Sequence, residues 1–147
     1  MNSNILPSSR VAIMGVIDPD ATAAGTVTTG WVSMSGFANA MAIVMAGTLG
    51  VSATLDAKIQ QATDSSGTGA KDITGKAITQ LTQAGTDSDK QVVINISEND
   101  LDVAGDFTHI RLSMTVGTAT SGAGGLLLGF DAAYAPATDA TTVDEIV

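Results

Sequence analysis

The sequence predicts an all-β protein, a single-domain antiparallel β-sandwich of jelly-roll-like form with about eight strands. Two observations predict this fold. Apolar and polar residues alternate with a period of two in several short segments, as they do in strands with one buried and one exposed face. Turn-forming residues, including many of the 16 glycines, separate these segments along the whole chain.

The chain organisation follows from length and composition. With 147 residues, the chain is long enough for one self-sufficient core, so we expect residues 1–147 to form one domain. We expect an extended N-terminal arm (1–9) and a polar C-terminal tail (137–147), both ordering on contact with neighbouring subunits. The first residues do not resemble a secretory signal, and the most apolar stretch, 40–49, is too short to span a bilayer.

The clearest pattern lies in residues 51–62. Its apolar positions alternate with polar ones and are Val51, Ala53, Leu55, Ala57 and Ile59. A polar loop (64–69), a second extended piece (73–81) and another polar loop (85–89) follow. This region is predicted to be a strand, a loop, a strand and a loop.

Six further segments read as strands: 10–17, 26–34, 40–49, 90–97, 108–116 and 125–135. The first should end at Asp18-Pro19-Asp20. Composition alone would allow 40–49 to be a helix, but its length and its glycines favour a strand that forms a hairpin with the next one across Gly50.

Alternation also predicts which side chains face the core. The expected inward residues of the later strands are Val92, Ile94 and Ile96, then Ile110, Leu112, Met114 and Val116, then Leu126, Leu128, Phe130, Ala132 and Tyr134. The acidic segment 98–105 reads as a helical turn or loop, with Leu101 and Val103 directed inward.

Charge and cysteine content exclude several classes of partner and chemistry. Fifteen acidic and six basic residues give a net charge of −9, which argues against nucleic acid and against an anionic membrane surface as partners. Cysteine is absent, so there is no disulfide and no thiolate ligand or nucleophile.

The candidate chemical sites all have ordinary structural interpretations. His109 is the only histidine and lies on a polar strand face, so neither a zinc site nor a nucleophilic triad is expected. The carboxylates Glu98, Asp100 and Asp102, and Asp87 with Asp89, lack the glycine and glutamate of a calcium loop and read as solvated, although a calcium ion stays open. We therefore expect no catalytic residue, no cofactor, no required metal and no enzymatic activity.

The segment 67–76, GTGAKDITGK, superficially suggests a phosphate-binding loop. The required spacing fails, because Ala70 stands where the first glycine is needed and Ala77 stands where a Ser or Thr must follow the lysine. A hairpin loop is the preferred interpretation.

The segment 59–85, IQQATDSSGTGAKDITGKAITQLTQAG, is the most specific part of a wider resemblance. With the Trp31 strand, the apolar strand 40–49, the late strand 110–116 and the ending Tyr134-Ala135-Pro136, it resembles small structural proteins encoded beside the major capsid protein in tailed bacteriophages.

The resemblance implies a capsid decoration, or cement, protein: a homotrimer on the outer surface of the virion, with the major capsid protein as its partner. The family has no catalytic motif. Two alternatives stay open, namely another virion part (head fibre, spike base or head–tail component) and a non-catalytic carbohydrate- or host-surface-binding sandwich. The second would require exposed aromatic residues, and aromatics are 3% of the chain.

Overall fold

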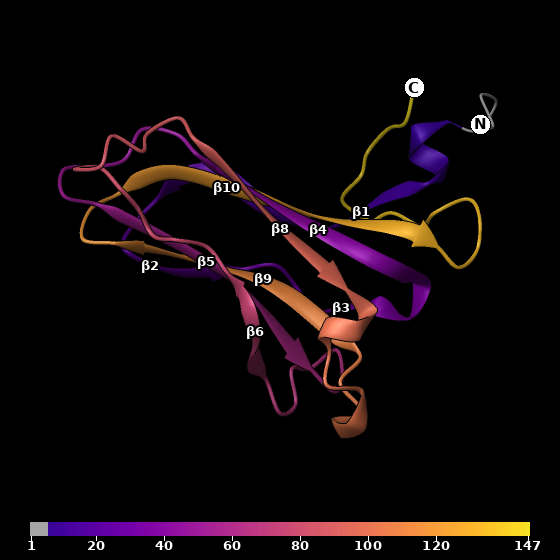
Figure 1. Cartoon of the computed structure of the whole chain (residues 1–147). Helices are drawn as coiled ribbons and strands as arrows, with labels where there is room; N and C mark the ends of the chain where they lie inside the picture. The colour runs from indigo at the N-terminus through magenta and orange to yellow at the C-terminus, as the bar shows by residue number, and fades with distance from the viewer. Residues whose placement is uncertain (1–5) are drawn as a thin grey trace.

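Two antiparallel sheets face each other across one core in the computed structural model, which describes residues 6–147 (Figure 1). The four-stranded sheet has the order β1-β10-β4-β8, with β1 Val11–Thr22, β10 Ser121–Ala132, β4 Phe37–Ala46 and β8 Gln91–Ser97. The six-stranded sheet has the order β2-β9-β5-β6, with β2 Gly25–Thr28, β9 His109–Gly117, β5 Thr54–Ala62 and β6 Lys71–Ala77. Two short strands complete it: β3 (Val32–Ser33) pairs with β9, and β7 (Leu81–Thr82) pairs with β5.

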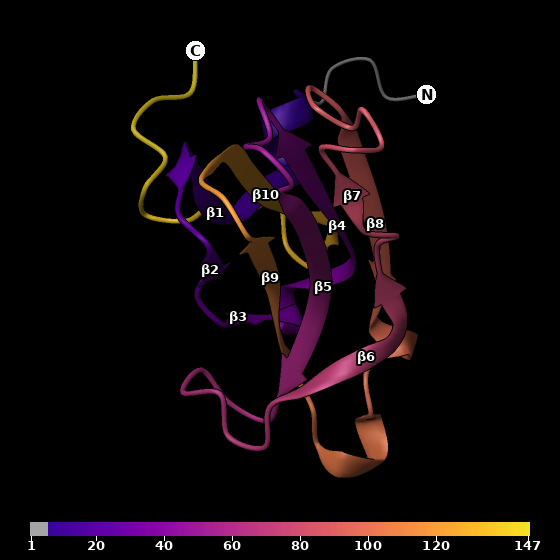
Figure 2. The same ribbon diagram turned by 90° about the vertical axis from the view of Figure 1, so that its left-hand side faces the viewer.

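The remaining regular structure of the described residues is four short 3-10 helices: η1 Pro7–Ser9, η2 Met34–Gly36, η3 Glu98–Asp100 and η4 Val103–Gly105. The fold is thus the predicted all-β, jelly-roll-like sandwich. Figure 2 shows how β5 and β9 run side by side through the six-stranded layer. Residues 1–5 of the predicted N-terminal arm lie outside the described residues.

The core forms where alternation is cleanest. On β9, the predicted inward residues Ile110, Leu112, Met114 and Val116 are all buried, and on β5 so are Leu55, Ala57 and Ile59. On β8, Ile94 and Ile96 are buried and Val92 is half-buried. Each of these strands has polar residues on its other face, so the period-two pattern assigned the buried side correctly.

The predicted hairpin between 40–49 and 51–62 is wrong. β4 pairs with β10 and β8 in one sheet, whereas β5 pairs with β9, β6 and β7 in the other. The chain crosses between the sheets in a tight passage at Gly50, where a Cβ would lie 2.5 Å from the Thr120 carbonyl oxygen. Val51 belongs to this crossing and is 80% exposed, so it is not a core residue.

The first strand does not end at Asp18-Pro19-Asp20. β1 continues to Thr22, and its register against β10 shifts between Ile17 and Asp20. A bulge at this shift accommodates Pro19, because the bulged residue is not required to donate to the ladder.

Two predicted strands are each divided. The segment 26–34 breaks at Thr29, which is buried; its Oγ1 accepts from the Leu112 N–H at 3.0 Å, and its own N–H donates to the Leu112 carbonyl at 3.0 Å. The segment 73–81 divides into β6 and β7 at residues 78–80. Within β6, Gly75 has a left-handed φ of 78° where the register against β5 shifts. Of the two residues predicted to point inward from 98–105, Leu101 is buried, but Val103 is 70% exposed in η4.

The last strand presents the opposite face from the one predicted. In β10, Leu127 and Ala123 are buried, whereas Leu126, Leu128 and Phe130 are only half-buried on the outer side, and Tyr134 lies beyond the strand. The core side carries Gly125 and Gly129. A Cβ at Gly125 would lie 2.8 Å from Leu112 Cδ2, and one at Gly129 would lie 2.7 Å from the Met14 sulfur. Neighbouring side chains therefore fill the space beside these glycines.

Candidate interaction surface

The outer face of the six-stranded sheet is polar. Residues of β9 and β5 that alternate with the core positions point to this side: His109, Arg111, Ser113 and Thr115 from β9, and Asp56, Lys58 and Gln60 from β5. Ser113 is buried within this face, and the others are half-buried. The predicted outward side of residues 108–116 is thereby confirmed.

Hydrogen bonds connect this polar face across three strands. Arg111 Nε donates to Gln60 Oε1 at 2.9 Å, and Gln60 Nε2 donates to Asp72 Oδ1 at 2.8 Å. Lys58 Nζ contacts Asp72 Oδ2 at 2.8 Å. The hydrogen bond from Lys58, with that from Gln60, lowers the pKa of Asp72. The polar groups thus satisfy one another along the sheet.

Trp31 sits at the border of this polar face but is not an open aromatic platform. The Arg111 guanidinium lies 4.4 Å from the centroid of the indole ring, in a cation–π arrangement. The loop at Gly67 packs against the indole Nε1 so closely that a Cβ there would clash. Arg111 thus occupies one face of the indole, and the Gly67 loop covers its Nε1 edge.

His109 lies at the start of β9, as predicted for a residue on the polar side. Its Nδ1 shares a hydrogen bond of 2.9 Å with the Thr108 hydroxyl. Among the hydrogen bonds of residues 6–147, His109 makes none to a serine or a carboxylate, so no Ser–His–carboxylate triad forms around it.

Three of the five carboxylates singled out in the sequence pair with a lysine. Asp100 contacts Lys76 at 2.9 Å, Asp102 contacts Lys71, and Asp87 contacts Lys90 at 2.7 Å. The lysine hydrogen bond is the main cause of the lowered pKa of Asp87 and Asp102.

For Asp100, partial burial opposes ionisation, but the Ser97 backbone N–H and Lys76 outweigh it and lower the pKa. Within the part of the chain that the structure describes, no three His, Cys, Asp or Glu side chains gather as a metal site would require.

The phosphate-loop lookalike at 67–76 is part of the hairpin between β5 and β6. Asp64 closes the turn, accepting from the N–H groups of Ser66 and Thr68. Both lysines of the segment, Lys71 and Lys76, are engaged by Asp102 and Asp100. The hairpin-loop interpretation is confirmed.

The outer face of the four-stranded sheet is apolar over β1, β10 and most of β4, whereas Asn39 of β4 and Gln91, Asn95 and Ser97 of β8 add polar side chains at its border. We call the apolar part the apolar face and define it by ten side chains, which are Val11, Ile13, Val16, Met41, Ile43, Met45, Val93, Leu126, Leu128 and Phe130. Strand register aligns them in rows across the sheet: Leu126 pairs with Val16 on one side and Ile43 on the other, and Ile43 pairs with Val93. Met45 is 38% exposed and Val93 is 53% exposed, and the other eight are half-buried.

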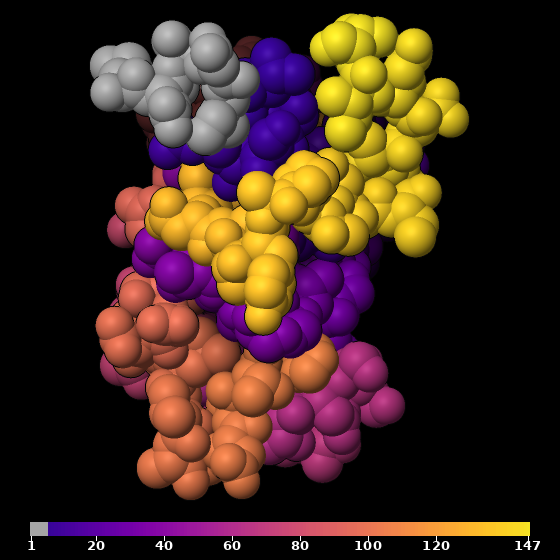
Figure 3. Space-filling model, turned by 90° about the vertical axis from the view of Figure 1, so that its right-hand side faces the viewer, coloured from indigo at the N-terminus to yellow at the C-terminus, as the bar shows by residue number. Residues whose placement is uncertain are grey.

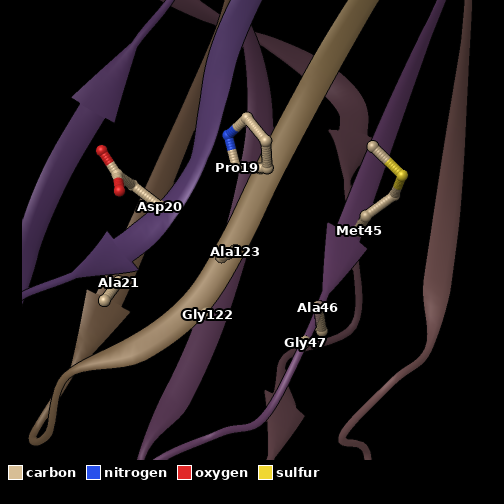
Figure 4. A pocket seen from close by; sticks show the side chains of 9 residues that line it. Pro19, Asp20, Ala21, Met45, Ala46, Gly47, Gly122 and Ala123 are labelled. Carbon is tan, nitrogen blue, oxygen red and sulfur yellow. The ribbon is translucent and has the colours of Figure 1, made fainter.

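A shallow groove of about 390 Å³ continues this face at one end of the sheet (Figure 4). Gly122, Ala123 and Gly124 of β10 form its floor, between Pro19–Ala21 of β1 and Met45–Gly47 at the end of β4. A Cβ at Gly124 would lie 2.8 Å from the Pro19 Cα, so glycine lets the bulged part of β1 approach. The side chain of Asp20 is the only ionisable one in the lining.

Both edges of the four-stranded sheet are capped by other parts of the chain. At the β1 edge, the C-terminal tail binds Ile13: its N–H donates to Asp139 Oδ1 at 2.7 Å, and its carbonyl accepts from the Ala140 N–H at 2.7 Å. At the β8 edge, Lys76 Nζ donates to the Asn95 carbonyl at 2.8 Å. Lysines and covering segments of this kind prevent further strands from adding to an edge.

The alternation of β10 did not reveal the apolar face, because it predicted that Leu126, Leu128 and Phe130 point into the core. The signal that could have located them is the spacing of Gly125 and Gly129. Glycines four residues apart share one strand face, and a face with no side chains suits close packing against another layer. Gln61 was also missed: it is buried, and its Oε1 accepts from the Asp102 N–H at 2.8 Å.

None of the short helices in residues 6–147 has the length or apolarity to cross a membrane. Taken together, the two sheets and their connections define the class of protein: a jelly-roll-like β-sandwich with one polar and one apolar outer face.

Comparison with known proteins identifies no family by sequence, since no family model and no curated protein matches the chain. Among solved structures, a chain of Broad Bean Stain Virus matches with a TM-score of 0.50 and 10% identity, covering 98% of each chain. Cowpea mosaic virus empty particles give a TM-score of 0.45 at 10% identity, with 94% of this chain and 91% of that chain covered. A structure named CBM4 gives 0.39 at 12% identity, with 82% and 71% covered. The first similarity shows that the fold also occurs in a virus particle.

Proposed function

We propose that this chain is a structural protein of a virus particle, and more specifically a capsid decoration protein of a tailed bacteriophage. In this role it binds the outer surface of the shell built by the major capsid protein and stabilises that shell. The observation that carries the proposal is the apolar face, an uncharged sheet surface on a chain with a net charge of −9. The resemblance of residues 59–85 to phage structural proteins supports the choice of partner.

The chemistry of the two outer faces supports a binding role without catalysis. On the polar face, ionic and amide groups are hydrogen-bonded to one another in a shallow layer on the sheet. On the apolar face, the defining residues have no ionisable group. A reaction site needs a positioned acid, base or nucleophile in a cleft, whereas an exposed apolar face suits contact with another protein.

An oligomer binds a shell of identical subunits more tightly than a single copy does. Each copy needs only a weak contact, because an oligomer that engages several subunits at once gains avidity through effective concentration. We propose a homotrimer, whose closed symmetry matches a threefold position on an icosahedral shell.

The segment before the C-terminal tail offers an exposed aromatic side chain for a contact with the shell. The C-terminal tail lies against the first part of the chain, where the Ala137 N–H donates to the Ser9 carbonyl at 3.1 Å (Figure 3). Tyr134, just before this contact, is 86% exposed. An aromatic side chain this exposed is available for a contact with the shell.

Heat resistance of particles with and without the protein tests this function. Particles that lack the chain should assemble, but release their DNA at a lower temperature than complete particles. Adding purified protein back to the deficient particles should restore the release temperature. Equal heat resistance of deficient, complete and reconstituted particles would overturn the cement role and favour a host-binding surface protein.

A further inference from the structure

We infer that a hollow on the polar face of the six-stranded sheet is a binding site for one neutral sugar ring, such as the end of a glycan. The inference does not depend on the contact with a shell, because it concerns the opposite side of the sandwich from the apolar face. It is carried by a nearly buried serine hydroxyl that faces the hollow and has no hydrogen-bond partner among residues 6–147.

The hollow lies over β5 and β9 and has a volume of about 300 Å³. That volume corresponds to about ten water molecules, and a hexose has about twelve non-hydrogen atoms, so one sugar ring matches it in size. Its lining combines four polar side chains with a short apolar wall, and the residues that carry the argument are Asp56, Lys58, Ser113, Thr115, Ala77 and Ile78.

Ser113 of β9 gives the clearest indication that the hollow takes a ligand. The residue is only 4% exposed, and its hydroxyl takes part in none of the side-chain hydrogen bonds of residues 6–147. No fully enclosed side-chain oxygen in this part of the chain lacks a partner, so the Ser113 Oγ is reached from the hollow that it lines. A hydroxyl in this position can donate to and accept from whatever fills the opening.

The charged groups beside Ser113 also have unused hydrogen-bonding capacity. Asp56 accepts from Gln80 Nε2 at 2.7 Å through Oδ2, which leaves Oδ1 without a hydrogen bond within the described residues. Lys58 Nζ contacts Asp72 Oδ2 at 2.8 Å, and an ammonium group has three N–H donors. The hollow therefore presents a free acceptor, free donors and a free hydroxyl together.

The opposite charges in the lining favour a neutral ligand over an ion. Asp56 and Lys58 are two residues apart on one face of β5, about 7 Å along the strand. An anion that approaches Lys58 meets the Asp56 carboxylate, and a cation that approaches Asp56 meets the Lys58 ammonium. Neighbouring hydroxyls of a sugar can donate to the carboxylate and accept from the ammonium at the same time.

The apolar wall suits the C–H groups of a sugar ring. Ala77 ends β6 and is exposed, and Ile78 follows it and is half-buried. The Ile78 N–H donates to the Ala57 carbonyl at 2.9 Å, which holds this wall against β5. A sugar ring has both C–H groups for the wall and several hydroxyls for the polar groups, whereas a single peptide amide has only one donor and one acceptor.

The test is a titration of the ¹⁵N-labelled full-length protein, followed by NMR, with D-glucose, D-galactose, D-mannose and N-acetyl-D-glucosamine as probes. At least one of these sugars should cause saturable shifts in the backbone amide signals of residues 56–58, 77–78 and 113–115. We expect a Kd on the order of 1–10 mM, because the ligand is small and the hollow is open. N-methylacetamide, which mimics a peptide group, should not saturate over the same range.

A matched pair of serine substitutions assigns the effect to the hollow. Ser113→Ala removes the free hydroxyl and should weaken binding of the responding sugar about three- to tenfold. Ser66→Ala makes the same chemical change in the exposed β5–β6 loop and should bind as the wild type does. Asp56→Asn changes a half-buried position instead of a buried one, removes the charge, and should weaken binding at least about threefold.

Three results would overturn the inference. The first is the absence of saturation by all four sugars up to about 100 mM, a concentration at which a millimolar site would be filled. The second is wild-type affinity in both Ser113→Ala and Asp56→Asn. The third is saturation of the same amide signals by N-methylacetamide, which would assign the hollow to a peptide segment.

Discussion

The two outer faces of the sandwich differ in the polarity of their side chains, although each is the outer side of a sheet that packs into the same core. On the six-stranded sheet, the outer side chains form a hydrogen-bonded polar layer through Arg111, Gln60 and Asp72. On the four-stranded sheet, the corresponding positions are Leu126, Leu128, Ile43 and their neighbours.

Solvation explains why the difference matters. The side chains of the polar layer hydrogen-bond to one another. The apolar layer leaves hydrocarbon in contact with water, and each square ångström removed from water contributes about 25 cal/mol. The outer face of the four-stranded sheet would therefore gain free energy on contact with an apolar partner, whereas the polar face of the six-stranded sheet would gain much less.

The largest expected effect separates the inside of the four-stranded sheet from its outside. Leu127 and Leu128 are neighbours on β10, but Leu127 is fully buried and Leu128 belongs to the apolar face. Leu127→Ala should lower the free energy of unfolding by about 2–5 kcal/mol, because it leaves a cavity in the core. Leu128→Ala should cost about 1 kcal/mol, since part of its side chain already contacts water.

Urea unfolding followed by circular dichroism measures both values. Both variants and the wild type should be compared at one low protein concentration, so that any self-association contributes equally. A larger cost for Leu128 than for Leu127 would mean that the alternation expected from the sequence was correct and that the apolar face is misassigned.

The second-largest expected effect compares alanine substitutions of two glycines that face opposite sides of β10. A Cβ at Gly129 would lie 2.7 Å from Met14 Sδ and from the Phe37 ring, whereas at Gly122, on the outer side, the nearest atom is 3.6 Å away. Gly129→Ala should therefore cost about 1–3 kcal/mol through overpacking. Gly122→Ala should be neutral or stabilising by up to about 1 kcal/mol, because alanine reduces the entropy of the unfolded chain. Thermal unfolding of the two variants compares them directly, and equal destabilisation would contradict the assigned faces.

The smallest effect concerns the polar face. Lys58→Met removes the partner of Asp72 and should cost only about 0–1 kcal/mol at pH 7, as expected for an exposed ion pair. Folding lowers the pKa of Asp72 from its ordinary value of 3.8, so its contribution to stability is present above that value and is lost as the pH falls through the folded pKa.

The difference in melting temperature between wild type and Lys58→Met should therefore shrink between pH 7 and about pH 3. Lys58→Arg keeps the charge and should retain most of the wild-type pH dependence. A difference that grows on acidification would show that Lys58 stabilises the fold by another route.

The same contrast between faces explains what could be predicted from the sequence. β5 and β9 each have one polar face, and the outer face of β8 is polar except for Val93, so alternation placed Leu55, Ile94 and Leu112 in the core correctly. β10 is apolar on both faces, and a period of two then cannot tell which set points inward. The glycines at 125 and 129 decide it, because Leu112, Met14 and Phe37 occupy the space they leave.

Local sequence patterns could not predict which strands pair when those strands are far apart in the chain. Residues 40–49 and 51–62 are adjacent in sequence and read as a hairpin, yet they lie in different sheets. The choice is made by partners more than thirty residues away, since β4 pairs with β8 and β10. Gln61 escaped notice for a similar reason: its hydrogen bond to the Asp102 N–H joins residues that are 41 positions apart.

The copy number of this chain relative to the major capsid protein in purified particles tests the central claim most directly. Quantitative mass spectrometry of particles that contain the chain gives this ratio without any substitution. A decoration protein that covers the shell through repeated identical contacts should be present in hundreds of copies per particle, on the order of the number of shell subunits. A dozen copies or fewer would contradict the account and assign the chain to a single vertex or to the tail.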